Sequence, residues 1–325
     1  MKFASFRCDD QDTYGVALAD DKILDLRSAA GKDAPDDLLA FIQSGASGLK
    51  LAADTLSELP PAAIVDANRI TWHPPVRRPG KICGIAMNNS ASNERKISAP
   101  DHPAFFLKPA SCLIGHKQAV EIRSYYGSVH PEPELAVVIG RAARDVDADD
   151  AVEHIFGYTI FDDFTGNGMR SEDLFRYYAL YSSDNDPDKL ERREQHLSYA
   201  GRYKGTDNFG AMGPWLVTKD EIPDPDKLRV TCKVGSEVVA EDSTRYYNYK
   251  VAEIVSLISQ FQTLHPGDVV SCGTAFKPSK DRKSIHHANL QNIDGPVEVS
   301  IEGLGTQEVD VVRRKTEIGD WRLKS

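Results

Sequence analysis

The chain has 325 residues, of which 41% are hydrophobic and 27% are charged, a composition typical of a globular protein with a sizeable core. Its formal net charge of −10 would repel a phosphate backbone, so no nucleic-acid partner is expected. Charged residues precede any apolar stretch at the start and no run is long enough to span a membrane, so we expect a cytoplasmic protein without a membrane partner.

The first part of the sequence predicts a small domain. Short strand-like pieces occur at Lys2–Phe6, Gly15–Ala19 and Lys22–Asp25, and a helical stretch follows around Asp36–Gln43. A proline pair then interrupts the pattern. We therefore predict a small N-terminal α/β domain over residues 1–75.

The remainder, residues 76–325, predicts a mainly β domain. Many short β-like segments follow one another, among them KICGIA, AFFLKP, ELAVVIG, FGYTIFDD and GDVVSCG. A single helix is expected between Val251 and Leu264, where apolar residues recur at helical spacing and should face the core: Val251, Ile254, Val255, Ile258, Phe261 and Leu264. The predicted fold class is therefore α+β.

A polar, aromatic and charged stretch between Arg170 and Lys204 is too long for a plain connection in a compact domain. Two interpretations remain open for it. The stretch is either a lid over a pocket or a helical insertion on the surface.

The segment HPEPELAVVIG places two acids, Glu132 and Glu134, at the mouth of an apolar run. Side chains alternate along a strand, so both acids point the same way. Two neighbouring carboxylates repel each other, and Mg²⁺ or Mn²⁺, which prefer oxygen ligands, would hold them together. The alternative is that both acids face solvent.

The next apolar strand, FGYTIFDD, also ends in acids, Asp162 and Asp163. Neighbouring strands that finish in carboxylates would bring three acids to one end of a sheet. Alternation puts Asp162 and Asp163 on opposite faces, and it leaves open which of them joins the glutamates.

These motifs, in order from Lys81 to Arg313, resemble those of the fumarylacetoacetate hydrolase superfamily, whose members act on 2-oxo acids and acylpyruvates. The E-x-E-L-a-V-V-I-G strand begins at Glu132, and G-Y-T-x-x-(N/D)-D ends at Asp163. The resemblance implies that Glu132, Glu134 and Asp163 bind Mg²⁺ or Mn²⁺. It also implies a mixed β-sandwich roll and a homodimer.

Three further matches imply residues that meet the substrate. Lys204 precedes a G-P pair and would stabilise a developing enolate. Thr274, in the P-G-D-x-V-x-x-G-T stretch, would contact the substrate carboxylate, and Lys108 in F-x-K-P would line the same cavity.

The sequence departs from the family pattern where hydrolases carry a histidine that activates water. Counting from Cys83, Glu94 falls on the family glutamate, but Ala91 stands in the place of the histidine. Glu94 is then expected to accept or donate the proton, with His116 or His130 as a substitute. Asn167 replaces a family arginine, and the nearby Arg170 is expected to bind substrate instead.

The resemblance implies a metal-dependent enzyme acting on a small 2-oxo acid, and we expect hydrolytic C–C cleavage of an acylpyruvate. A second expectation is a dehydratase, because the sequence also resembles the 2-keto-3-deoxy sugar acid dehydratases, which lack the histidine too and need no attacking water. Decarboxylation or keto–enol tautomerisation comes third. A non-catalytic metal-binding relic comes last, since a drifting site should lose clustered acids first.

Overall fold

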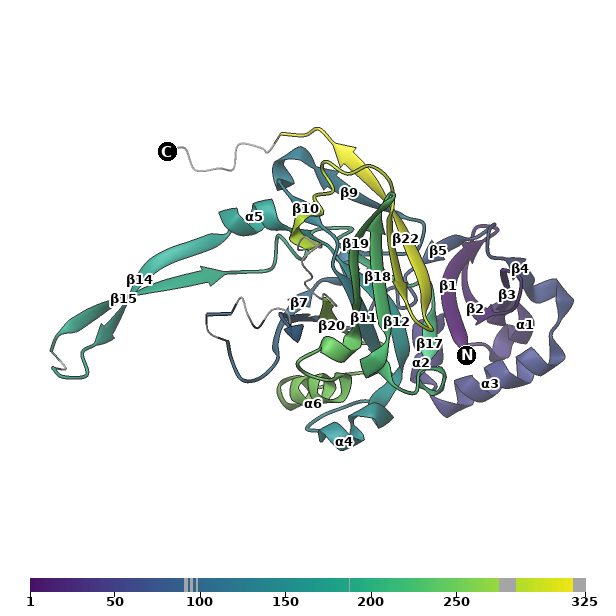
Figure 1. Ribbon diagram of the computed structural model, residues 1–325. Helices are drawn as coiled ribbons and strands as arrows, with labels where there is room; N and C mark the ends of the chain where they lie inside the picture. The colour runs from purple at the N-terminus through teal and green to yellow at the C-terminus, as the bar shows by residue number, and fades with distance from the viewer. Residues whose placement is uncertain (91–92, 94–95, 98, 187, 275–284, 318–325) are drawn as a thin grey trace.

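A long mixed β-sheet runs through the computed structural model, which describes residues 1–325 except 91–92, 94–95, 98, 187, 275–284 and 318–325 (Figure 1). Three further strands pair with it at its sides: β5 (Thr71–His73) with β1 (Lys2–Cys8), β16 (Gly210–Met212) with β12 (Ile155–Asp163), and β8 (Leu113–Ile114) with β16. Across the sheet the order is β4 (Ile64–Asp66), β3 (Lys22–Asp25), β2 (Gln11–Ala17), β1 (Lys2–Cys8), β17 (Leu216–Thr218), β12 (Ile155–Asp163), β11 (Pro133–Ile139), β20 (Val269–Thr274), β6 (Ile82–Ala86) and β7 (Ala104–Lys108).

A second sheet packs against the middle of the first. Its order is β19 (Glu237–Ser243), β18 (Arg229–Val234), β21 (Val297–Ile301), β22 (Gly305–Arg314) and β9 (Ala119–Arg123). Apolar side chains from both sheets share one buried cluster. The α+β class with a mainly β sandwich is confirmed, and two short strands, β10 (Val129–His130) and β13 (Thr165–Gly166), form a small ribbon beside it.

Strand β11 lies at the centre because both of its faces are apolar. Leu135, Val137 and Ile139 face the cluster shared with the second sheet. Ala136 and Val138 face a separate cluster built with residues of the N-terminal region. A strand buried on both faces reads as a continuous apolar run rather than an alternating one, which explains the sequence of β11.

The N-terminal region forms the expected mixture of strands and helices. The predicted strands correspond to β1, β2 and β3, and the predicted helical stretch to α2 (Leu38–Gln43), preceded by α1 (Leu26–Ala30) and followed by α3 (Ala46–Glu58). The main sheet continues into this region, because Lys2 and Phe3 of β1 pair with Val217 and Leu216 of β17. The division at residue 75 stays a prediction.

Helix α6 (Val251–Phe261) confirms the helical periodicity near residue 251. The backbone N–H of Lys250 donates to the carboxylate of Glu253 at 2.6 Å and so caps its start. The prediction that Phe261 faces the core is wrong, because this side chain is 68% exposed. It is the last residue of the helix, and the chain turns away at Gln262 in extended backbone.

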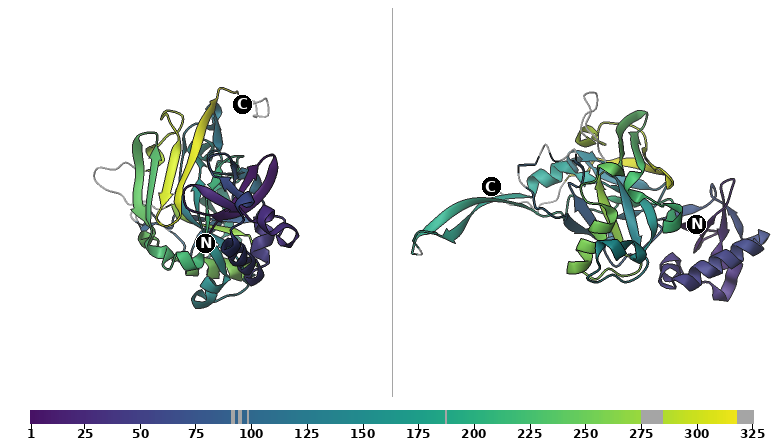
Figure 2. Two further views of the ribbon diagram at one scale, coloured as in Figure 1. Left: turned by 90° about the vertical axis from the view of Figure 1, so that its right-hand side faces the viewer. Right: turned by 60° about the horizontal axis from the view of Figure 1, so that its bottom comes forward.

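The stretch between Arg170 and Lys204 is not a helical insertion. After the short helix α5 (Asn167–Glu172), it forms two long antiparallel strands, β14 (Leu174–Ser182) and β15 (Leu190–Ser198). They project far from the body of the molecule, as Figure 2 shows, and we call them the β-arm.

Helix α4 (Ala148–Ala151) lies beside α6. No described helix is long and apolar enough to cross a membrane.

Gly157 permits close packing where β12 meets β17. A Cβ atom at this position would lie 2.1 Å from the carbonyl oxygen of Val217, which is backbone and cannot swing away. We expect Gly157→Ala to lower the free energy of unfolding by about 1–3 kcal/mol through overpacking. Denaturant titration measures this change.

The matched control is Gly201→Ala, because an added Cβ at Gly201 meets no atom within 4 Å. This control should stay within about 0.5 kcal/mol of the parent protein. Equal stabilities for the two variants would contradict the tight β12–β17 contact.

Candidate metal centre

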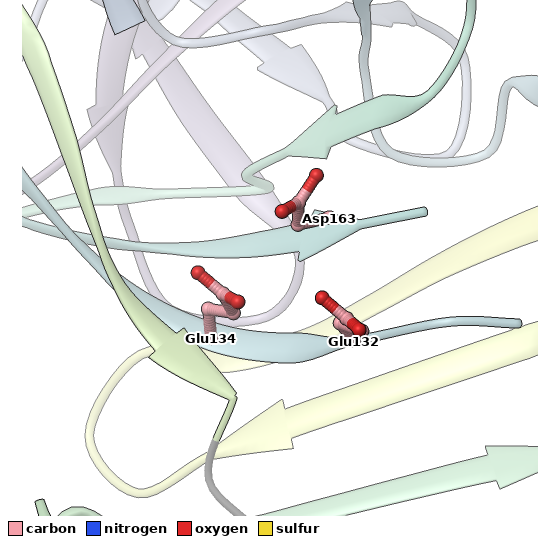
Figure 3. A group of neighbouring side chains, drawn as sticks. All are labelled: Glu132, Glu134 and Asp163. Atoms are coloured by element: carbon pink, nitrogen blue, oxygen red, sulfur yellow. The ribbon is translucent and has the colours of Figure 1, made fainter. Parts of the chain in front are cut away.

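Three carboxylates converge where β11 begins beside the end of its antiparallel neighbour β12. One oxygen from each of Glu132, Glu134 and Asp163 lies within 4.8 Å of the others. Figure 3 shows the three side chains turned toward a common space, with Glu134 on β11, Glu132 directly before this strand and Asp163 at the end of β12. The three acids predicted from the sequence therefore lie together, and their role as metal ligands stays a prediction.

The β11–β12 register decides which aspartate joins the glutamates. Pro133 pairs with Asp162, and the N–H of Asp163 donates to the carbonyl of Glu132 at 3.0 Å. Asp163 therefore shares the face of Glu134. Asp162 points to the other face, where its Oδ1 accepts from the N–H of Glu132 at 2.8 Å. Burial raises the pKa of Asp162 to about 8.

Strand β20 holds the carboxylate of Glu134 from the other side. Oε2 accepts from the Ser271 hydroxyl at 2.5 Å and from the Gly273 N–H at 3.0 Å, while the Thr274 hydroxyl donates to Oε1 at 3.3 Å. Burial, and next the negative charge of Asp163, raise the pKa of Glu134 to about 8. The site therefore resists a third negative charge unless a cation compensates it.

Lys204 follows the β-arm and lies between two of the acids. Its Nζ donates to Oε2 of Glu132 and to Oδ2 of Asp163, both at 2.6 Å, and lies 5.3 Å from the ring centre of Phe106. Burial alone would raise the pKa of Glu132, but the ammonium of Lys204 holds it well below its usual range. Burial would lower the pKa of Lys204, but the negative charge of Asp163 outweighs burial and raises this pKa.

Lys108, the last residue of β7, holds the carboxylate of Asp163 in place. Its Nζ donates to Oδ1 of Asp163 at 2.5 Å, to the carbonyl of Phe209 at 3.0 Å and to the carbonyl of Lys204. Its side chain is completely buried. All three ammonium hydrogens are thus used within the protein, so Lys108 ties Asp163 and the backbone of Lys204 together.

His130 supports the cluster at its edge. Its Nε2 lies 3.0 Å from Oε1 of Glu132, and its Nδ1 lies 3.2 Å from the side-chain nitrogen of Asn167. The amide is a donor and the carboxylate an acceptor, so the proton of a neutral ring belongs on Nε2. His130 therefore orients Glu132, and Asn167 orients His130.

Two further residues predicted for the site, Arg170 and Glu94, remain to be placed. Arg170 is exposed on α5, where its guanidinium lies 6.0 Å from the ring centre of Tyr203. Its role stays a prediction. Glu94 and Ala91 lie outside the described residues. Sequence reasoning missed Ser271, whose signal is a lone hydroxyl inside the apolar run VVSCG.

The donors fit a hard divalent cation. Carboxylate oxygens are the ligands that Mg²⁺ and Mn²⁺ prefer, and three of them from rigid strands leave positions open for water or a ligand. Burial and the negative charge of Asp163 raise the pKa of Glu134, and a bound cation would favour its ionised form. Glu132, Glu134 and Asp163 would hold such an ion.

The fold and this cluster define a class of protein: a β-sandwich roll that collects carboxylates and lysines in one buried site. Residues 81–312 match the model of the fumarylacetoacetate (FAA) hydrolase C-terminal domain. The chain belongs to the fumarylacetoacetate hydrolase family.

Several proteins similar to this chain are enzymes. The human mitochondrial oxaloacetate tautomerase FAHD2A is 31% identical over 241 residues, which cover 74% of this chain and 69% of the relative. The structure of a maleylpyruvate hydrolase from Sphingobium sp. SYK-6 with manganese(II) ion and pyruvate is 24% identical, with a TM-score of 0.70 over 96% of this chain and 99% of that one.

A 5-carboxymethyl-2-hydroxymuconate delta-isomerase from Mycobacterium smegmatis is 23% identical, with a TM-score of 0.66 over 97% of this chain and 100% of that one. At these identities the two structural likenesses show the fold alone. The named reactions in this group include hydrolysis, isomerisation and tautomerisation.

Proposed function

We propose that this chain is a divalent-metal-dependent enzyme that acts on a small 2-oxo acid and hydrolyses the C–C bond of an acylpyruvate. The observation that carries the proposal is the buried convergence of Glu132, Glu134 and Asp163 beside the ammonium of Lys204. The manganese ion and pyruvate held by the structurally similar maleylpyruvate hydrolase support the choice of ion and substrate class.

The cation, Mg²⁺ or Mn²⁺, would supply Lewis-acid polarisation of the substrate carbonyl. The protein supplies the rest. Lys204 places a positive charge where negative charge grows as a 2-oxo acid enolises, and such preorganised charge stabilises a transition state without further reorganisation. Lys108 keeps Asp163 and the backbone of Lys204 in position.

Hydrolysis adds water to the acyl carbonyl, breaks the bond to the pyruvyl carbon, and yields a carboxylic acid and pyruvate. The water must lose a proton. Ala91 stands where hydrolases of the family carry the histidine that activates water. Glu94 is therefore the residue that we propose accepts this proton. His130 is a poor substitute, because Glu132 and Asn167 already occupy both of its ring nitrogens.

Keto–enol tautomerisation of a 2-oxo dicarboxylic acid is the second candidate. Two observations favour it: Ala91 leaves out the water-activating histidine, and the 31% identical human relative is an oxaloacetate tautomerase. Tautomerisation needs only a proton moved between carbon and oxygen, so Lys204 beside the carboxylates would be enough to assist it.

The deciding experiment incubates the protein with acylpyruvates, 2-keto-3-deoxy acids and oxaloacetate, with and without Mg²⁺ or Mn²⁺. Mass spectrometry separates hydrolysis, which adds water and splits the molecule, from dehydration, which loses water. Ultraviolet absorbance of the enol follows tautomerisation, which leaves the mass unchanged. Turnover that is equal in the presence and absence of metal would overturn the metal-dependent proposal.

Metal affinity should depend on pH through Glu134, whose pKa in the metal-free protein is raised to about 8. A carboxylate must lose its proton before it binds a metal ion. The apparent affinity for Mg²⁺ should therefore rise about tenfold per pH unit below about 8 and level off above it, with proton release on binding.

Calorimetric titration in two buffers of different ionisation enthalpy measures both the affinity and the released proton. Glu134→Gln should remove the proton release in the same titration. An affinity that does not change across this pH range would contradict the role of Glu134.

A further inference from the structure

The outer edge of β14 has no partner strand within the described part of the chain. β14 pairs with β15 along its whole length, and the two form a sheet of their own. Figures 1 and 2 show the β-arm reaching away from both large sheets. A two-stranded ribbon is only marginally stable alone in water, so such an arm gains stability from a further layer or strand.

The two edges of the β-arm differ in charge. β15 carries four charged residues in a row, Glu191 to Glu194, which protect an edge against pairing with another strand. β14 reads Phe-Arg-Tyr-Tyr-Ala-Leu-Tyr from Phe175 to Tyr181, with Arg176 as its only charge. Glu194 of the same arm binds Arg176 at 2.7 Å and neutralises it. The unprotected edge is therefore that of β14.

The side chains on β14 are exposed although they are large and apolar. Phe175, Tyr178 and Leu180 are 57%, 61% and 59% exposed. A long, apolar edge strand of this kind is normally covered in a soluble protein, because it otherwise pairs with other chains. The composition of β14 thus indicates a surface that is covered in the working protein.

We propose that β14 pairs antiparallel with β14 of a second copy of this chain, about a two-fold axis at Tyr178. The two arms then form a continuous four-stranded sheet across the dimer. This proposal assigns the homodimer expected for the family to a particular strand, and it is independent of the proposed reaction.

The occupant is a second copy because β14 is complementary to itself in this register. Phe175 of one copy stands opposite Tyr181 of the other, which is a favourable aromatic cross-strand pair. Tyr177 stands opposite Ala179, so a large side chain meets a small one. Arg176 stands opposite Leu180, and its charge is already balanced by Glu194, so no like charges face each other.

The test is a charge swap at the two-fold axis. Tyr178→Lys and Tyr178→Asp should each place like charges directly opposite each other and raise the dimer dissociation constant by at least about tenfold, as expected for a central interface tyrosine. Light scattering coupled to size-exclusion chromatography measures the mass of each. A mixture of the two variants should recover the dimer, because lysine then faces aspartate.

Leu190→Lys is the matched control. It places the same new charge on the same arm, at an exposed position on the protected strand β15, and it should leave the dimer intact. A parent protein that is monomeric at micromolar concentration would overturn the proposal. A dimer dissociation constant that Tyr178→Lys leaves unchanged would also overturn it, because another surface would then hold the copies together.

Cross-linking tests the register without disturbing the charge balance. A chain carrying both Phe175→Cys and Tyr181→Cys should form disulfides between copies under mild oxidation, since these positions face each other across the axis. Phe175→Cys alone should form far fewer. Monomers after oxidation of the double variant would overturn the proposed pairing, as would an arm that binds only lipid vesicles or an unrelated peptide.

Discussion

Glu134→Gln is expected to lower the turnover of a 2-oxo acid by at least ~10³-fold, since Lewis-acid stabilisation is worth several kcal/mol and each 1.4 kcal/mol is about tenfold in rate. Glutamine keeps the size of Glu134 and one oxygen for Ser271 and Gly273, but it removes the negative charge that binds a cation. Steady-state kinetics and a metal titration measure the two losses.

Asp149→Asn serves as the matched control, because it removes a carboxylate from the exposed first turn of α4. It should leave both turnover and metal affinity unchanged. The melting temperature of Glu134→Gln should stay close to that of the parent, so the loss is one of chemistry rather than of folding. Full turnover by Glu134→Gln would contradict the assignment of the metal centre.

Lys108→Met is expected to lower the free energy of unfolding by about 3–5 kcal/mol, the usual cost of removing one partner of a buried ion pair. The substitution leaves Oδ1 of Asp163 and the carbonyl oxygens of Lys204 and Phe209 without their buried donor. Denaturant titration of the metal-free protein measures this loss.

A double-mutant cycle isolates the contact. When Asp163→Asn is added, the carboxylate that Lys108 binds is no longer charged, so the double variant should be more stable than the sum of the single losses predicts, by at least ~1 kcal/mol. Lys219→Met removes a partly exposed ion pair to Glu153 and should cost about 0–1 kcal/mol. Equal losses for Lys108→Met and Lys219→Met would contradict the structural role of Lys108.

The parts of the fold that bury large apolar side chains could be predicted from the sequence. β11 and α6 show long, regular apolar patterns because they lie in the core. Helix α3 gave no such signal, because it buries the small residues Gly48, Ala52 and Thr55. The β-arm gave none either, since neither face of its strands packs on a core and no alternation is needed.

The site could be predicted only in part for a related reason. Glu134 and Asp163 lie within the apolar strands β11 and β12, and Glu132 directly precedes β11. The sequence motifs of the family identify all three. The residues that hold these carboxylates in place come from distant parts of the sequence. Ser271 reaches Glu134 across the β11–β20 pairing, and Lys108 reaches Asp163 from β7. Sequence patterns describe which face a residue occupies, but they do not give the partner that a distant strand brings to it.

The pairing of β1 with β17 affects the order in which contacts form during folding. Lys2 and Phe3 of β1 pair with Val217 and Leu216, which lie far along the chain, so this end of β1 completes its pairing only after β17 has been synthesised. Contacts so distant along the chain form late and slowly, because a large loop must close first. During that interval Lys2 and Phe3 present an open strand edge, the kind of edge that pairs with strands of other chains.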